Sequence, residues 1–168
     1  SRGLGDVYKR QNNIPVATSF RRQDLFDHKN ENFAGSFGTS VSSNLIDSTK
    51  NSDLIIVLGA RLGEMTTQGY SIINPQDIPK NIMHIHVDPN ELNKVFNANV
   101  CINVGVNECC DKLEELTLDN SDRWKDWRNE LNKNYLEDSK PQENKNLNNL
   151  SKIFEIVEKK FPTNSIIT

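Results

Sequence analysis

A glycine and an arginine directly follow a short, uninterrupted apolar run, and this combination could bind a ligand. Residues 53–70 read DLIIVLGARLGEMTTQGY, so the run ends at Gly59, Ala60 and Arg61. Glycine would let a ligand approach the backbone closely, and the planar guanidinium of Arg61 could meet a phosphate. Alternatively, Gly59 only makes the turn and Arg61 is a solvated surface charge. The spacing alone leaves both interpretations open.

Histidines and cysteines are the other residues with the chemistry of a site. His84 and His86 alternate on an apolar stretch, so they would point to one face of a strand and could offer two metal ligands. No third ligand lies nearby in sequence, and we therefore predict no metal site. Cys101, Cys109 and Cys110 form neither a CxxC pair nor a disulfide framework, which indicates reduced thiols.

Short apolar runs predict the strands that would position these residues. The run at 54–58 carries no polar side chain, which is typical of a strand buried on both faces of a parallel sheet. The connection from 59 to 81 is too long for a hairpin, so the next strand should run parallel to it. The predicted strands are residues 14–18, 54–58, 82–87 and 100–104. They predict an α/β fold with a Rossmann-like, doubly wound parallel sheet flanked by helices.

Helical spacing of apolar residues fills the intervals between the predicted strands. Val41, Leu45 and Ile46 share one side of a helix after the capping-type residues Thr39 and Ser40. Three more helices are predicted at residues 107–116 with Asn107 as the cap, at 121–137, and at 150–161. The helix at 121–137 carries a stripe of Trp124, Trp127, Leu131 and Tyr135, which we interpret as a packing surface.

Ligands of open parallel sheets bind outside the carboxyl ends of the strands. In this chain those ends are Thr18, Gly59, Asp88 and Gly105.

The net charge is −3 and acidic and basic residues are interspersed, which argues against nucleic-acid and membrane-surface partners. No apolar run approaches the roughly 20 residues of a membrane helix, and no secretory signal is present. We therefore expect a cytoplasmic protein.

Both ends of the sequence look unlike the remainder. Residues 1–11, SRGLGDVYKRQ, fit no strand or helix period and resemble translated adapter read-through, so we exclude them as a non-native-looking tail. At the other end, TNSIIT at 163–168 reads as the first residues of another strand. We expect the chain to be truncated at both ends.

Three segments in order resemble the central domain of the acetolactate-synthase-like family of thiamine diphosphate enzymes. They are IPVATSFRRQDLFDH, DLIIVLGARLGEMTTQGY and MHIHVDPNELNKVF. The later segment RWKDWRNEL resembles the helical linker after that domain. The resemblance implies that 12–118 is the central domain without its first strand, 119–162 the linker, and 163–168 the start of the domain that binds the diphosphate.

The resemblance also implies an activity for the parent enzyme. Enzymes of this family depend on thiamine diphosphate and Mg²⁺, and they join or cleave the bond beside the carbonyl of a 2-oxo acid. Their catalytic glutamate and GDG-type metal motif lie in two flanking domains that this sequence does not contain. The expected partners are those missing domains, within a homodimer or homotetramer. We therefore assign no catalytic residue here and expect the chain alone to be inactive.

In the acetolactate synthases the central domain holds FAD, while other relatives bind a different nucleotide or none. Carried over position by position, the resemblance gives as cofactor-binding residues Gly38, Thr39, Gly59, Ala60, Arg61, His86 and Val87. Two departures count against FAD: Leu-Gly-Glu-Met follows Arg61 where flavin-binding members tend to show Phe-Asp-Asp-Arg, and Val-Gly stands near 104 where they tend to show Gly-Asp. The alternative is a stand-alone NAD-binding, nucleotide-binding or scaffold module of similar fold.

Overall fold

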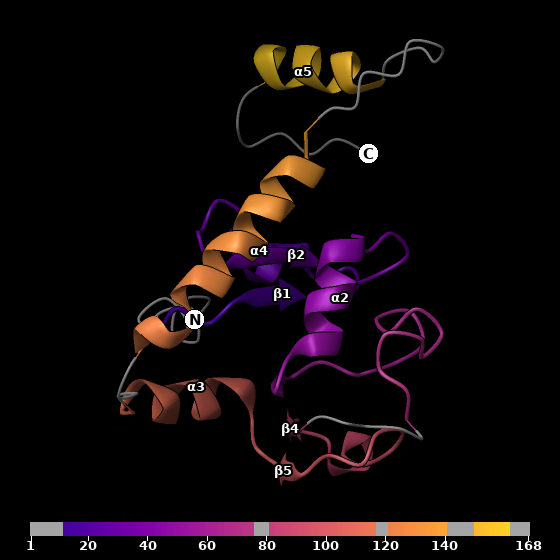
Figure 1. Cartoon of the computed structure of the whole chain (residues 1–168). Helices are drawn as coiled ribbons and strands as arrows, with labels where there is room; N and C mark the ends of the chain where they lie inside the picture. The colour runs from indigo at the N-terminus through magenta and orange to yellow at the C-terminus, as the bar shows by residue number, and fades with distance from the viewer. Residues whose placement is uncertain (1–11, 76–80, 117–120, 141–149, 162–168) are drawn as a thin grey trace.

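A computed structural model describes residues 12–75, 81–116, 121–140 and 150–161 (Figure 1). Its strands are β1 Val16–Thr18, β2 Phe33–Ser36, β3 Leu54–Leu58, β4 Asn81–Ile85 and β5 Val100–Ile102. Its α-helices are α2 Ser43–Asn51, α3 Val106–Glu114, α4 Lys125–Asp138 and α5 Leu150–Lys160. Short 3-10 helices are η1 Gln23–Leu25, η2 Pro89–Glu91 and η3 Ser121–Trp124. The predicted α/β class is confirmed.

Within the described residues, all strand pairing is parallel and forms two sheets. β1 pairs with β2, and the second sheet has the order β3-β4-β5. The predicted parallel pairing of 54–58 with the strand after it is confirmed, with Leu54 opposite Asn81 and Leu58 opposite Ile85. The connection of more than 20 residues between them is long enough for a crossover between parallel strands, which needs about a dozen residues or more.

The prediction of one continuous sheet is wrong for the part of the chain that the structure describes. The strand at 14–18 does not pair with 54–58; instead β1 pairs with β2, a strand that the sequence analysis missed. The β2 sequence is Phe-Ala-Gly-Ser, which is short and contains a glycine. It has little of the β-branched, apolar character that identifies strands in a sequence.

The prediction that 54–58 is buried on both faces is also wrong. Val57 is 5% exposed, whereas Leu54 is 46% and Ile56 is 45% exposed. The face with Val57 packs into a buried cluster that also contains Ile72, Ile73, Ile82 and Phe96. The opposite face bears Leu54 and Ile56 and stays largely open to solvent, which is unusual for apolar side chains on neighbouring positions of one face.

Helix α2 begins later than predicted. Its N-cap is Ser42, whose hydroxyl accepts a hydrogen bond from the Leu45 amide at 3.2 Å. Thr39 and Ser40, the predicted caps, precede it. Several hydroxyl residues in this stretch could cap a helix, so residue type alone does not select the one that is used.

Helix α3 begins earlier than predicted, because Gly105 and not Asn107 is its N-cap. The Glu108 carboxylate accepts a hydrogen bond from the Gly105 amide at 3.4 Å, which is half of a capping box. A glutamate three residues after a glycine was the sequence signal for this start.

Helix α4 packs against β2 and α2 (Figure 1). Leu131 is 4% exposed and lies in a buried cluster with Ala34 and Leu45, while the ring of Tyr135 meets Phe33 edge-on at 4.8 Å. Trp127 packs against the same cluster. The prediction of a packing stripe on this helix is therefore confirmed for Trp127, Leu131 and Tyr135.

A buried arginine anchors α4 to the segment before β2. Arg128 is 3% exposed, and its Nη1 donates to Asn32 Oδ1 at 3.1 Å and lies 2.6 Å from Glu31 Oε1. Nη2 donates to Asn129 Oδ1 at 2.8 Å. Buried charges need such partners to offset the cost of desolvation.

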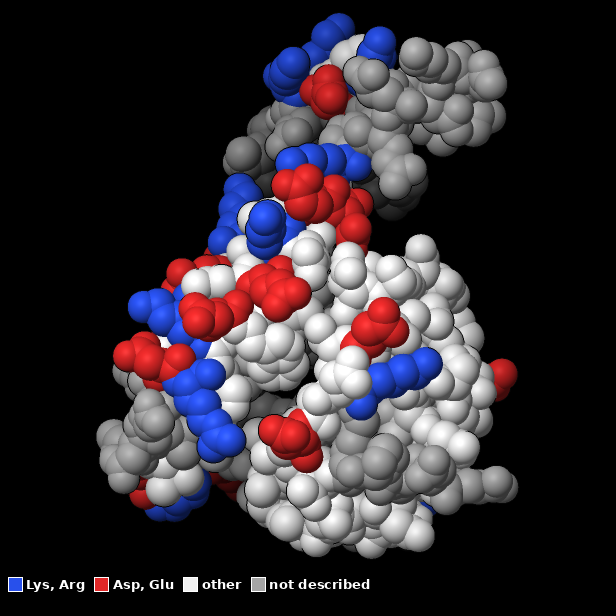
Figure 2. All heavy atoms as spheres, viewed as in Figure 1, with Lys and Arg blue, Asp and Glu red and all other residues white. Residues whose placement is uncertain are grey.

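The described surface is mixed in charge. Figure 2 shows acidic and basic side chains interspersed along α4, whereas much of the lower part of this face carries few charges. The predicted amphipathic helix at the end is present as α5, with Ile153 and Ile156 both 53% exposed. Among the described helices, none combines the length and apolar character needed to cross a membrane.

Candidate functional site

The turn after β3 requires glycine for reasons of packing. Gly59 has φ +66°, and its amide donates to the Ile85 carbonyl at 2.8 Å, which continues the β3–β4 ladder. A Cβ at Gly59 would fall 2.4 Å from Val106 Cγ2 on α3. The turn and the close approach of α3 therefore explain this glycine without any ligand.

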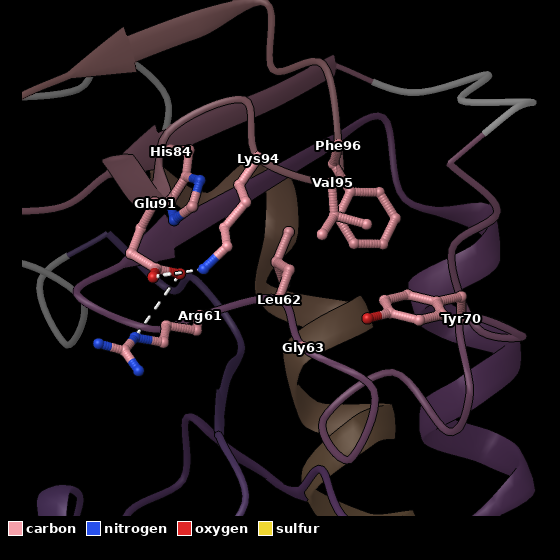
Figure 3. Close-up of a pocket in the computed structure, with 9 residues that line it drawn as sticks. All are labelled: Arg61, Leu62, Gly63, Tyr70, His84, Glu91, Lys94, Val95 and Phe96. Atoms are coloured by element: carbon pink, nitrogen blue, oxygen red, sulfur yellow. Dashed lines mark hydrogen bonds and ion pairs between the residues drawn. The ribbon is translucent and has the colours of Figure 1, made fainter. Parts of the chain in front are cut away.

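Beyond that turn lies a cavity of about 200 Å³ (Figure 3). It is lined by Arg61, Leu62, Gly63, Tyr70, His84, Glu91, Lys94, Val95 and Phe96. Leu62, Tyr70, Val95 and Phe96 supply apolar surface. Figure 3 shows Lys94 Nζ and Arg61 Nε facing the carboxylate of Glu91. The loop after β3 thus meets the segment after β4, as expected at the carboxyl ends of parallel strands.

The three charged groups carry a small excess of positive charge. Lys94 Nζ lies 2.9 Å from Glu91 Oε1, and Arg61 Nε lies 3.6 Å from Glu91 Oε2. Two cations and one carboxylate leave a net charge of +1. The hydrogen bond from Lys94 lowers the pKa of Glu91, and the nearby charge of Arg61 lowers it further. The Arg61 side chain is 68% exposed, so most of its guanidinium is free to meet an anion.

The two histidines of β4 and its continuation are tied to backbone groups. His84 Nε2 lies 3.0 Å from the Ala60 carbonyl, where the ring N–H donates and helps to hold the loop. His86 Nδ1 lies 3.0 Å from the Asp88 amide nitrogen, which donates to it. No group of three or more His, Cys, Asp or Glu side chains that could hold a metal ion occurs among the described residues.

The carboxyl ends of β4 and β5 are joined by one asparagine. Asn103 Nδ2 donates to the carbonyls of His86 and Val87 at 2.9 and 2.8 Å. Asp88 begins η2, and its carboxylate accepts hydrogen bonds from the amide and the side chain of Asn90, which lower the pKa of Asp88. Val87 keeps an exposed side chain, at 67%.

A second cavity, of about 280 Å³, adjoins a later part of the loop after β3. It is lined by Gly38, Thr39, Glu64, Met65, Gln68 and Gly69. A Cβ at Gly38 would fall 2.8 Å from Phe20 Cδ2, so a glycine is also needed here for packing. The segments 61–63 and 64–69 of one loop therefore line two neighbouring cavities.

The predicted site residues are brought to one edge of the strands but not into one cavity. Arg61 lines the first cavity, and Gly38 and Thr39 line the second. Neither cavity is lined by Gly59, Ala60, His86 or Val87. These four residues lie at the ends of β3 and β4 and in the segments that follow these strands.

The sequence analysis missed Glu91 and Lys94. They stand three residues apart, shortly after Asp88-Pro89, and this spacing of opposite charges is a recognisable signal for an ion pair. The sequence could not show that Arg61, thirty residues before Glu91, would form an ion pair with it.

These features define an α/β domain of parallel strands with polar loops gathered at their carboxyl ends, an arrangement typical of nucleotide-binding folds. The chain matches the family model "Thiamine pyrophosphate enzyme, central domain" over residues 9–113. It belongs to this family and carries the central domain of a thiamine diphosphate enzyme. No curated protein matches the chain.

The residues described here do not fit every group that the family implies. They contain no acidic cluster for Mg²⁺, so we derive no step of thiamine chemistry from them. Each cavity is smaller than the roughly 300–1,000 Å³ that drug-sized ligands occupy. Arg61, Lys94 and Glu91 fit the phosphate and ribose part of a nucleotide, and neither cavity alone holds a complete FAD.

Proposed function

We propose that this chain is the central domain of an acetolactate-synthase-like enzyme that depends on thiamine diphosphate and Mg²⁺ and acts on 2-oxo acids. The family match over residues 9–113 supports the thiamine diphosphate class. The segments LIIVLGAR and MHIHVDP support the acetolactate-synthase-like type by resemblance. In this proposal other domains of a longer polypeptide provide the thiamine site, and the enzyme is a cytoplasmic homodimer or homotetramer.

The second part of the proposal is that the Arg61 cavity binds the phosphate and ribose part of a nucleotide, with FAD as the first candidate. Arg61 and Lys94 would pair with phosphate oxygens, and Glu91 would accept hydrogen bonds from ribose hydroxyls. The apolar wall with Tyr70 and Phe96 would cover one side of the ligand. The observation that carries this proposal is the convergence of Arg61, Glu91 and Lys94 beside that wall.

The chemistry of the intact enzyme would come from its cofactor. Thiamine diphosphate, held by other domains, would supply the electron sink for the reaction of a 2-oxo acid. The residues of this domain would act on binding only. Arg61 would orient a phosphate, and the His84 contact to Ala60 would hold the loop that presents Arg61.

Titration of the purified 168-residue chain with FAD and with ADP tests the nucleotide proposal. We expect Arg61→Ala to weaken binding by about 1.5–3 kcal/mol, the scale of a hydrogen bond to a charged group. This corresponds to a dissociation constant raised roughly 10- to 150-fold. Arg123→Ala removes the same charge from an exposed position that lines neither cavity, and it serves as the matched control.

Equal affinities in wild type and Arg61→Ala would contradict the assignment of the site. The competing candidate is a scaffold domain without a ligand, and two observations favour it: packing alone explains Gly59, and Glu91 already has cationic partners. Equilibrium dialysis against FAD, ADP and NAD separates the candidates. Binding of none of the three by the folded chain would make the domain a scaffold, and a preference for NAD would favour the stand-alone module.

A further inference from the structure

His84 is a buried polar side chain that lines the Arg61 cavity (Figure 3). It is 4% exposed, and its Nε2 lies 3.0 Å from the Ala60 carbonyl oxygen. A carbonyl oxygen only accepts hydrogen bonds, so the neutral ring has its proton on Nε2 and a lone pair on Nδ1. Among the described residues, none forms a hydrogen bond with this Nδ1. Polar atoms of buried side chains normally have a partner, and the cavity is where a ligand could supply one.

The groups around the ring decide which ligand that could be. Residues of three segments meet His84 at the cavity: the loop after β3, the turn η2 and the stretch that follows η2. On the sheet, His84 is paired with the apolar Val57 of β3. The titratable or charged groups that face it are Arg61, Tyr70, Glu91 and Lys94 in the cavity, His86 with its ring 6.0 Å away, and Cys101 as its paired residue on β5.

The charges of the cavity do not balance those of a diphosphate. Arg61 and Lys94 contribute two positive charges and Glu91 one negative charge, so these groups sum to +1. The diphosphate of a dinucleotide such as FAD carries two negative charges, so cavity and ligand together sum to −1. One proton on His84 would bring this sum to zero. Charges withdrawn from water need such compensation.

We propose that His84 is a ligand-binding residue of the Arg61 cavity and takes up one proton when the diphosphate of a nucleotide binds. The proton comes from solvent and goes to Nδ1, which then donates to a phosphate oxygen. Nε2 keeps its hydrogen bond to Ala60 throughout, so the loop that presents Arg61 stays in place. This inference rests on the proposed nucleotide site and adds a residue to it. Because the bound state holds one more proton than the free state, affinity should rise as the pH falls.

Calorimetric titration of the purified 168-residue chain with FAD tests the proposal. FAD is suitable because both its phosphates are diesters of constant charge, whereas a terminal phosphate such as that of ADP itself titrates near about pH 6. Titrations in two buffers that differ in enthalpy of ionisation give the number of protons taken up. At about pH 7 we expect roughly half a proton to one proton per FAD, and a dissociation constant about tenfold higher at about pH 8 than at about pH 6.

His84→Gln separates proton uptake from the contact that holds the loop. The glutamine amide can still donate to the Ala60 carbonyl, but it cannot take up a proton. We expect this variant to bind FAD without net proton uptake, with a dissociation constant that changes less than about twofold between about pH 6 and about pH 8. His28→Gln removes an exposed histidine that lines neither cavity, and it should keep the proton uptake of wild type.

FAD binding without proton uptake would overturn the role of His84 and would leave the nucleotide site standing. Proton uptake that persists in His84→Gln would do the same, since another group would then receive the proton. Absence of FAD binding by the folded chain at every pH would overturn the nucleotide site and this inference together.

A measurement on wild type keeps the test decisive if His84→Gln does not fold. In ¹⁵N spectra of the imidazole nitrogens, FAD should shift the Nδ1 signal of His84 from the unprotonated to the protonated form at about pH 7. The Nε2 signal should stay that of a protonated nitrogen, because Ala60 accepts from it in both states. An Nδ1 signal that stays unprotonated in the FAD complex would overturn the proposal.

Discussion

Replacing Gly59 by alanine tests whether this glycine serves the fold, as the packing of α3 indicates. The substitution places a Cβ on a residue with φ +66°, which costs about 1–2 kcal/mol for an L-residue. It also places that atom 2.4 Å from Val106 Cγ2, so the helix or the turn must shift. Overpacking of this kind costs typically about 1–3 kcal/mol. We expect Gly59→Ala to lower the free energy of unfolding by about 2–5 kcal/mol.

Gly69 offers a matched control, because it has the same φ of +66° and nothing within 4 Å of its added Cβ. Gly69→Ala should therefore cost only the conformational part, about 1–2 kcal/mol. Val106→Ala removes the clashing methyl groups, so Gly59→Ala in that background should cost about as little as Gly69→Ala. Urea unfolding followed by circular dichroism measures each of these variants against wild type.

Together these variants separate the conformational cost of an alanine with positive φ from the cost of its clash with Val106. If Gly59→Ala costs no more than Gly69→Ala, the contact with Val106 is not part of the folded state in solution. If Val106→Ala fails to recover stability, the clash is with something else. Either result would refute the packing explanation of Gly59. It would favour the alternative, in which this glycine lets a ligand approach the backbone.

Three further predictions concern the core under α4, the charge of Glu91 and the activity of the chain. Leu131→Ala, at a position 4% exposed beneath β2, should destabilise the fold by about 2–5 kcal/mol in urea, whereas Leu136→Ala, at 51% exposure, should change it by less than about 0.5 kcal/mol. Because the folded pKa of Glu91 lies below its ordinary 4.5, its stabilisation is present at neutral pH and lost as the pH falls through the folded pKa. The urea midpoints of wild type and Glu91→Gln should therefore differ at neutral pH and converge as the pH falls through the folded pKa of Glu91; a constant gap would contradict this. The 168-residue chain should not turn over pyruvate when supplied with thiamine diphosphate and Mg²⁺, and measurable consumption would refute that expectation.

Strand prediction succeeded where a run was long, apolar and branched. The run at 54–58 matches β3 residue for residue, because LIIVL has no competing local structure. β2 escaped notice, since Phe-Ala-Gly-Ser owes its extended form to pairing with β1 and not to its own preference. The exposure of Leu54 and Ile56 could not be predicted from the sequence either. An apolar run indicates that a strand can be buried. It does not show which other elements of the chain cover the strand.

The site was predicted only in part, for a related reason. Arg61 could be placed at the end of a strand from local sequence and the rule for parallel sheets. Its meeting with Glu91 and Lys94 depends on the β3–β4 pairing, which brings residues thirty positions apart together. Gly38 and Thr39 were grouped with Arg61 by resemblance, but they line a different cavity from that of Arg61.

The nucleotide site is tested most directly by a residue-resolved titration of the ¹⁵N-labelled chain with ADP, the part that FAD and NAD share. We expect saturable chemical-shift changes that are largest at the amides of residues 61–63, 91 and 94–96, which line the Arg61 cavity. The Gly69 amide, beside the second cavity, should move less. A spectrum of the folded chain that ADP leaves unchanged, or shifts confined to other residues, would contradict the proposed site.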